Sequence, residues 1–403
     1  MGNTPNVRFK GFTEDWEQRK LGELYQRNTE RNENLIGYDK TISVATMSYK
    51  DDGNGASESS LSTYKVLRVG DIAFEGHTNK QFRFGRFVVN DIGTGIMSPR
   101  FSTLRPLNEM PVNFWKQYIH SEAVMRRILV NSTKAGTMMN ELVIPEFLNQ
   151  TIMVPSENEQ AVIGQYFTNL DHLITLHQQK CDETKEFKKY MLQNMFPQKD
   201  EKVPKIRFAG FTGDWEQRKL GDVAEYRNGK AHENEIDDDG EYIVVNSKFV
   251  STNGEIKKFS NAQNEPLYEN EIAFVLSDVP NGRAIARTFL IEKSGKYTLN
   301  QRIAGITPHE DTDPYYLHIK MNRNAYFLKF DDGNKQTNLS IKDVLNYEDM
   351  YPNYKEQQKI GNYFRSLDHL ITLHQQKCAV LKEFKKYMLQ NMFPQKGENK
   401  CQN

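Results

Sequence analysis

Residues 164–199 read GQYFTNLDHLITLHQQKCDETKEFKKYMLQNMFPQK, and residues 361–396 read GNYFRSLDHLITLHQQKCAVLKEFKKYMLQNMFPQK. The two stretches are identical at 30 of 36 positions. Apolar residues recur in each at alternating four- and three-residue intervals, which is the spacing of a coiled-coil seam. No proline interrupts either stretch before Pro197 and Pro394, where the ring would end a helix. The pattern predicts two long helices, over residues 157–196 and 354–393.

Each predicted helix carries an apolar stripe that would be exposed if the helix stood alone. We therefore expect the two helices to pair within the chain, although two separate surface helices would also fit the pattern. The residues expected at the pairing seam are Ile163, Phe167, Leu170 and Ile174 in the first helix and Ile360, Phe364, Leu367 and Ile371 in the second.

Two histidine–cysteine pairs lie one helical turn apart on the predicted helices, His177 with Cys181 and His374 with Cys378. If they met at one height they would form a Cys2His2 set, which is a zinc ligand set. Seam positions are often filled by such residues without a metal, and zinc would also require both pairs to coincide. We therefore expect no metal site.

A second repeat precedes each helix. Residues 7–22 read VRFKGFTEDWEQRKLG and residues 206–221 read IRFAGFTGDWEQRKLG, with 13 of 16 positions identical. Between the repeats the sequence has diverged, although GDIAF at 70–74 still resembles NEIAF at 270–274. Internal repetition of this kind predicts one structural unit made twice. The expected segments are a first domain at 1–156, a long helix at 157–199, a second domain at 200–353, and a second helix with its tail at 354–403.

The diverged stretches combine short β-rich runs with turn signals. YIVV at 242–245, IAFV at 272–275 and TFLI at 288–291 are typical of strands. Amphipathic segments around 114–129 and 314–328 are typical of helices. The fold class expected is α+β, with two small mixed α/β domains in tandem and two long helices.

Several loops in the diverged stretches are polar and basic in matching places, which suits reading of DNA grooves. Arginine pairs with guanine, asparagine and glutamine pair with adenine, and lysine neutralises phosphate. For any one of these residues a solvated loop is the simpler interpretation; together they form a candidate DNA-binding set. The set is Lys80, Gln81, Arg83, Arg86, Arg100, Lys134 and Thr137 in the first half, and Ser277, Asn281, Arg283, Arg287, Arg302, Lys335 and Gln336 in the second.

Composition adds limits rather than a function. Lys plus Arg and Asp plus Glu each number 53, so any basic patch must be local. Three cysteines without a CxxC pair argue against a disulfide framework and favour the cytoplasm. We find no P-loop, GxGxxG, HExxH or GxSxG sequence and no signature of a DNA amino-methyltransferase. We therefore expect no catalytic residue in this chain.

The repeated blocks resemble those of the specificity subunit (S, HsdS) of type I restriction-modification systems. The resemblance rests on RFKGFTEDWEQRKLGEL and its copy, on Pro155–Gln160 and Pro352–Gln357 at the two helix openings, and on LDHLITLHQQK followed by FKKYMLQNMF. It covers nearly the whole chain.

The resemblance implies that each diverged half is a target recognition domain, which reads one half of a split, asymmetric DNA sequence. It implies that the long helices pack antiparallel as a coiled coil, set the spacer and dock two methyltransferase (M) subunits, which restriction (R) subunits can join. S-adenosylmethionine, ATP and Mg would then belong to those partners, and this chain would hold no cofactor and contact no membrane.

Two other functions remain open from the residues alone. A protein-binding scaffold would show no sequence-dependent DNA binding, even with M subunits present. A self-sufficient DNA-modifying enzyme would transfer a methyl group or cleave DNA by itself.

Overall fold

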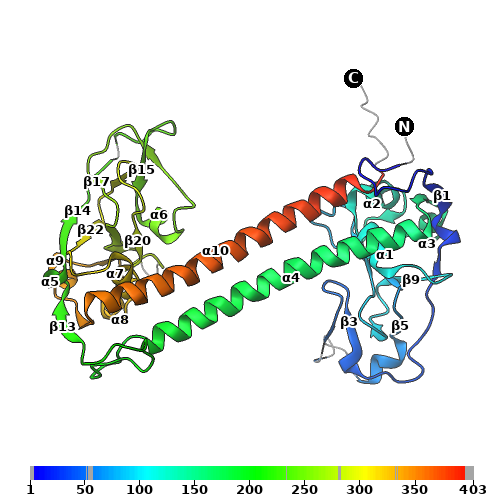
Figure 1. Ribbon diagram of the computed structural model, residues 1–403. Helices are drawn as coiled ribbons and strands as arrows, with labels where there is room; N and C mark the ends of the chain where they lie inside the picture. Colours follow the sequence, from blue (N-terminus) through cyan, green and yellow to red (C-terminus); the bar gives the residue numbers. More distant parts are fainter. Residues whose placement is uncertain are drawn as a thin grey trace. The chain divides into compact units, whose positions relative to one another are not determined.

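Figure 1 shows the computed structural model of the chain, which describes residues 4–50, 52, 58–232, 234–279, 283–331, 333 and 335–394. The chain divides into two compact units: unit 1 combines Met1–Gln179 with Gln375–Asn403, and unit 2 is Lys180–His374. Each unit therefore contains a segment of both long helices. The four segments expected from the sequence keep their bounds as predictions, whereas the expected fold class is confirmed.

Unit 1 contains two four-stranded sheets, with strand orders β2-β9-β6-β7 and β4-β3-β8-β5. Their strands are β2 (Tyr25–Arg27), β9 (Ser102–Pro106), β6 (Ile72–Glu75), β7 (Arg86–Val89), β4 (Ser48–Lys50), β3 (Thr41–Ser43), β8 (Gly95–Met97) and β5 (Lys65–Leu67). The short α-helices that accompany them in the described residues are α1 (Val112–Tyr118), α2 (Glu122–Val130) and α3 (Ile144–Asn149). Aromatic side chains, among them Trp16, Phe114 and Trp115, fill the core of this unit.

Unit 2 repeats this plan, with sheets ordered β14-β22-β18-β20 and β16-β15-β21-β17. The strands are β14 (Ala224–Asn228), β22 (Ile303–Pro308), β18 (Ile272–Val275), β20 (Thr288–Leu290), β16 (Phe259–Ser260), β15 (Tyr242–Val245), β21 (Tyr297–Leu299) and β17 (Pro266–Leu267). Its short helices are α5 (Leu220–Val223), α6 (Ser247–Ser251), α7 (Pro314–Met321), α8 (Ala325–Leu328) and α9 (Ile341–Leu345). The strands expected at 242–245, 272–275 and 288–291 are therefore confirmed to within one residue.

The helices expected around 114–129 and 314–328 are each broken in two. In unit 1, Ser121 has an extended backbone and begins α2. In unit 2, Arg323 has φ +55° and the side chain of Asn324 caps α8 by accepting from the Tyr326 N–H. Helical periodicity reveals neither break: Asn324 caps its helix through its side chain, whereas Ser121 interrupts the helix by its extended backbone without a side-chain cap.

The two long helices are α4 (Glu157–Asn194) and α10 (Tyr354–Asn391). Within unit 1, Asp171 of α4 accepts from Lys385 of α10 at 2.6 Å, and the Ile174 carbonyl lies 4.0 Å from the Cys378 sulfur. Unit 2 repeats these contacts through Lys188 with Asp368 and Cys181 with Ile371. In each unit the partner residue number falls as the other rises, so the helices run antiparallel. Among the described residues, every helix is too short or too polar to span a lipid bilayer.

The apolar stripe of each long helix serves a domain as well as the other helix. Ile163, Phe167 and Leu170 are buried in the core of unit 1, together with Met392 and Phe393, which directly follow α10. Ile360, Phe364 and Leu367 occupy the same place in unit 2, where α4 adds Met191 and Leu192 and is followed by Met195. Ile174 and Ile371 are half-buried. The stripe therefore fastens each helix to its own domain.

The repeated sequence blocks form the joint between each domain and its helices. Arg8 makes a two-pronged ion pair with buried Glu159, and Arg207 does so with buried Glu356. β1 (Glu17–Lys20) pairs with β12 (Thr151–Val154), and β13 (Glu216–Lys219) pairs with β24 (Glu348–Tyr351).

The glutamines of the two helix openings have a matching structural role. Gln160 donates to the Pro155 carbonyl at 3.0 Å, and Gln357 donates to the Pro352 carbonyl at 2.9 Å. The Glu-Gln pair that opens each helix therefore holds the start of the helix to the preceding chain.

Candidate nucleic-acid interface

The predicted DNA-binding loops of unit 1 lie at one edge of its first sheet. β6 ends where antiparallel β9 begins, because Phe74 pairs with Ser102. The loop after β6 also meets the loop before β11 (Glu141–Leu142), since the Asn140 N–H donates to the Gly76 carbonyl at 2.9 Å. A Cβ on Gly76 would lie 1.9 Å from the Asn140 oxygen, so only glycine permits this approach.

Within this edge the side chain of Asn79 folds the loop, because it accepts from the backbone N–H groups of Gln81 and Phe82. The predicted residues that are exposed here are Lys80, Gln81, Arg83, Arg100, Lys134 and Thr137. Lys134 of β10 (Thr133–Lys134) lies 3.2 Å from Glu141, and the Arg100 guanidinium lies over the Phe101 ring. DNA contact by these residues stays a prediction.

Arg86 is the predicted residue of unit 1 with the most complete set of protein partners. It is half-buried, its Nε donates to Glu75 at 2.5 Å and its Nη2 donates to the Ala45 carbonyl at 2.9 Å. Glu75 therefore neutralises Arg86, and reading a base would require this pair to open.

The loops of unit 2 meet in the same way. Ser277 and Asp278 of β19 (Ser277–Asp278) pair with Asn338 and Thr337 of β23 (Thr337–Asn338), and Gln336 donates to the Ser277 hydroxyl at 2.9 Å. Arg302 precedes β22, and its carbonyl accepts from the Leu276 N–H at 2.9 Å. The equivalent sheet edge thus gathers predicted residues in both units.

Accessibility within unit 2 differs among the predicted residues. Arg283, Arg302, Lys335 and Gln336 are exposed, Arg287 is half-buried and Ser277 is buried. Ser277 therefore positions Gln336 in this structure. Asn281 lies outside the described residues.

Sequence reasoning missed Arg323, which lies beside the loop that carries Arg287. Its N–H donates to the Ala286 carbonyl at 2.8 Å, and its Nη1 donates to the Ile285 carbonyl at 3.2 Å. Arg323 lies inside the helix predicted around 314–328, so its sequence carried no loop signal. The break at Asn324 was the one available clue.

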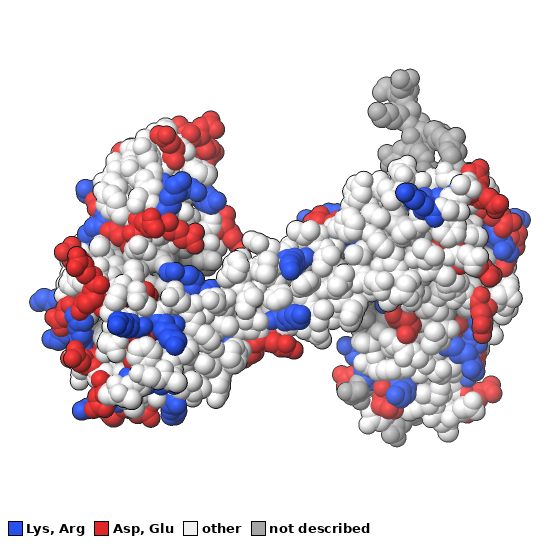
Figure 2. All heavy atoms as spheres, viewed as in Figure 1, with Lys and Arg blue, Asp and Glu red and all other residues white. Residues whose placement is uncertain are grey.

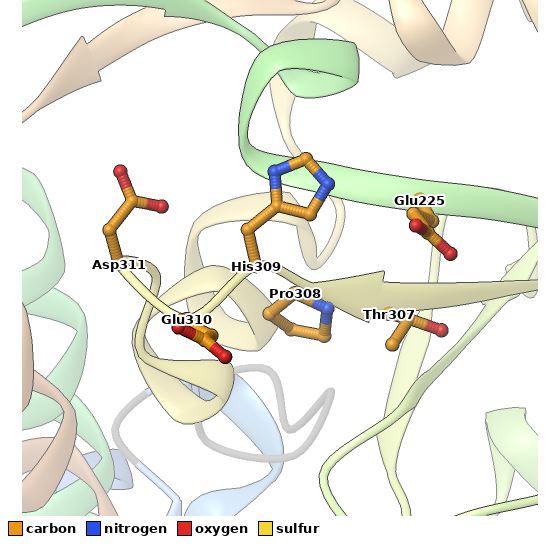
Figure 3. Close-up of a pocket in the computed structure, with 6 residues that line it drawn as sticks. All are labelled: Glu225, Thr307, Pro308, His309, Glu310 and Asp311. Carbon is orange, nitrogen blue, oxygen red and sulfur yellow. The ribbon is translucent and has the colours of Figure 1, made fainter.

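Charge is locally balanced over much of the surface. Figure 2 shows Lys and Arg interspersed with Asp and Glu over the visible face of each unit. A hollow of about 500 Å³ in unit 2 is lined by Glu225, Thr307, Pro308, His309, Glu310 and Asp311, which Figure 3 shows as sticks. Its three carboxylates make it unsuited to phosphate.

The seam cysteines Cys181 and Cys378 are both buried as free thiols. Each sulfur lies near a backbone carbonyl of the other helix, at 4.0 Å. Among the described residues, no group of three or more His, Cys, Asp or Glu side chains could hold a metal ion.

Solved structures share this architecture. The S subunit of a type I restriction-modification system from M. genitalium matches with a TM-score of 0.61 and 15% identity, covering 97% of this chain and 99% of that one. A chain from a structural study of complex assembly and conformational transition of the type I R-M system matches with a TM-score of 0.54 and 15% identity, covering 94% and 98%. These matches define the class of fold, that of a two-domain S subunit.

The sequence itself identifies the family. The model for the type I restriction modification DNA specificity domain matches twice, at residues 13–186 and 212–383. This chain therefore belongs to the type I restriction-modification specificity family and carries two copies of its domain. A search of curated protein sequences gives no significant match.

Proposed function

We propose that this chain is the non-catalytic DNA-reading subunit of a type I restriction-modification complex. Each unit reads one half of an asymmetric bipartite target, and the long helices set the spacer. The observation that carries the proposal is that the two units share one fold, whereas the loops at the end of their first sheets differ in sequence. Because the loops 76–86 and 277–287 differ in sequence on matching sheets, the two half-sites are expected to differ.

The long helices supply a matched docking surface for two methyltransferase subunits. Phe187 and Tyr190 are 48% and 53% exposed on α4, and Phe384 and Tyr387 are 45% and 54% exposed on α10. Residues three apart on a helix share one face, and exposed aromatic pairs are typical of protein interfaces. One pair belongs to unit 2 and the other to unit 1, which matches two copies of one partner.

In this proposal all the reaction chemistry belongs to the partners. Methyl transfer from S-adenosylmethionine resides in the M subunits, and ATP- and Mg-dependent cleavage resides in the R subunits. The chain would act in the cytoplasm with its duplex DNA target.

The decisive experiment is co-expression of this chain with its M subunit, followed by long-read mapping of methylated adenines in the host. A split, asymmetric motif supports the proposal. Methylation without any shared motif would refute it, and methyl transfer by the chain alone would point to an enzyme instead.

The spacer can be tested in the same assay. We expect the insertion of seven residues into both helices, after Gln179 and Gln376, to lengthen the spacer by about three base pairs, since seven helical residues span about 10 Å. A heptad preserves the seam, and insertion at mid-helix leaves the stripes anchored in the two domains. An unchanged spacer would refute the measuring role of the helices.

A further inference from the structure

Three arginines of unit 2 gather at one corner, between the loop before β20 and the end of α7. Arg287 donates through Nε to the Arg283 carbonyl at 2.6 Å, and the Arg323 side chain and N–H both bond the same loop, at Ile285 and Ala286. The pKa of Arg287 is lowered from its ordinary value, first by burial and then by the charges of Arg323 and Arg283. The guanidinium groups of Arg323 and Arg283 therefore each repel that of Arg287.

At the position in unit 1 that corresponds to this corner, an acidic residue, Glu75, pairs with the arginine. Strand pairing places Phe87 opposite Phe74 and Thr288 opposite Phe274, so Arg86 and Arg287 occupy equivalent positions. The equivalent of Glu75, which neutralises Arg86, is Val275.

The nearby carboxylate of Asp278 does not replace that acid. It accepts from the backbone N–H groups of Val279, Ala284 and Ile285. Within the described parts of the chain, Arg283, Arg287 and Arg323 form no ion pair.

The backbone that holds this corner is strained. Arg323 and Ala286 have φ values of +55° and +57°, in the left-handed region that residues with a Cβ seldom adopt. The hydrogen bond from Arg323 to Ala286 joins these two residues. Strain that persists around like charges is typical of a site organised for a ligand.

We propose that Arg287 and Arg323, assisted by Arg283, bind a backbone phosphate of duplex DNA next to the half-site that unit 2 reads. The inference rests on the proposed function and assigns a phosphate contact to it. A phosphate would supply the negative charge that Glu75 supplies in unit 1. Guanidinium forks match phosphate oxygens, and such contacts fix the register of a protein on DNA without reading sequence.

The test measures binding of the full-length chain to a fluorescent duplex of random sequence at about 50 to 200 mM salt. We expect Arg323→Asn to weaken binding and to reduce the slope of log affinity against log salt by about 0.9 for each phosphate that the variant no longer neutralises. Asparagine tolerates the left-handed backbone, so the variant removes charge with the least added strain. Arg323→Lys should keep most of the slope.

Two further variants guard against a folding artefact and a general charge effect. Arg283→Asn alters an exposed loop residue and should also lower the slope. Lys202→Asn, which removes an exposed charge paired with Asp214, should leave the slope unchanged.

A wild-type slope in both Arg323→Asn and Arg283→Asn overturns the inference, as does the absence of salt-dependent DNA binding by the wild type. Equal competition by inorganic phosphate at matched ionic strength would also overturn it, by showing a small-anion site. The proposed function fails separately, if methylation mapping finds no split motif while the arginine variants still lower the slope.

Discussion

Each unit neutralises a buried carboxylate at the same place in its first sheet, but the arginine comes from a different strand in each. In the first sheet of each unit, a buried carboxylate directly precedes one of the two central strands: Asp71 precedes β6 and Glu271 precedes β18. In unit 1 it is held by Arg105 from β9, with Asn28 at 3.5 Å after β2. In unit 2 it is held by Arg227 of β14 and by Thr307 of β22.

Strand register shows that this is an exchange rather than a new arrangement. Leu104 and Ile306 lie opposite Ile72 and Ile272, so Arg105 is equivalent to Thr307. By the same register Asn28 is equivalent to Arg227. The arginine therefore lies on different strands in the two units, while the acid is paired with an arginine in both. The shared fold keeps this ion pair rather than the residue at each position.

The arginine corner described above shows the opposite behaviour. There unit 1 keeps an acid beside Arg86, and unit 2 has replaced it with valine. The ion pair inside the sheet is kept in both units, whereas the ion pair beside the candidate DNA-binding loops is present in unit 1 alone of the described parts. The difference separates structural charges from charges available to a ligand.

The largest effect is expected from breaking the exchanged pair. Arg105→Thr should lower the free energy of unfolding of unit 1 by about 3 kcal/mol, because Asp71 would be left buried without its cation. Adding Asn28→Arg recreates the arrangement of unit 2 and should recover more than half of the loss. Urea unfolding followed by hydrogen exchange in peptides of unit 1 measures both. A double variant as unstable as the single one would show that the exchange is not equivalent.

The stability of the two units should depend differently on pH. Burial, followed by the charge of Lys188, lowers the pKa of His318 in unit 2 to about 4. Between pH 6.5, the ordinary pKa, and about pH 4, the unfolded chain binds a proton at this histidine and the folded unit does not. The free energy of unfolding therefore decreases as the pH is lowered through this window. The loss should reach about 3 kcal/mol in unit 2.

Unit 1 should respond mainly at lower pH, because burial lowers the pKa of its His120 less than that of His318. There, hydrogen bonding from Arg68 lowers the pKa of Glu30 from 4.5 to about 2, and its stabilisation is lost as pH falls through that range. Hydrogen exchange between pH 6.5 and 4.5 should therefore show unit 2 opening first, and His318→Gln should abolish the difference. Equal opening of both units would contradict this prediction.

A third comparison concerns partner docking. Phe187→Ser and Phe384→Ser should each weaken one methyltransferase contact by about 2 kcal/mol, or roughly thirtyfold, because each removes an exposed aromatic anchor. Native mass spectrometry of the complex should then show loss of one M subunit for either variant and of both for the pair. Retention of two M subunits by the double variant would place docking elsewhere.

The smallest effect is expected at single loop residues. Arg83→Ala should weaken recognition of one half-site by about tenfold and leave the other half-site read, since one base contact contributes about 1–3 kcal/mol. Gln336→Ala, which removes an exposed residue of unit 2 predicted to pair with adenine, should affect the opposite half-site. Methylation profiling of hosts that carry each variant compares them, and equal loss at both half-sites would argue against independent reading.

The helices and several strands could be predicted because their signals are local. Seam spacing fixed α4 and α10, and apolar runs such as 272–275 fixed the central strands. The domain core around Phe167 could not be predicted in detail, because the same stripe faces both a partner helix and a domain.

The candidate interface was only partly predictable. Sequence indicated the basic loops, but it could not show that Arg86 is neutralised by Glu75 or that Ser277 is buried. Arg323 was missed because its position depends on a broken helix and a positive φ. Such facts come from pairing across the chain, which composition and spacing do not report.

One consequence concerns the order in which the protein is completed during synthesis. Unit 2 is continuous in sequence, so a nascent chain can close its core once residue 374 has left the ribosome. Unit 1 must wait, since its core includes Met392 and Phe393, and the Val7 N–H bonds the Asn391 carbonyl. The half made first is therefore the half finished last, and a prematurely terminated product would expose an unsealed hydrophobic surface for proteases to recognise.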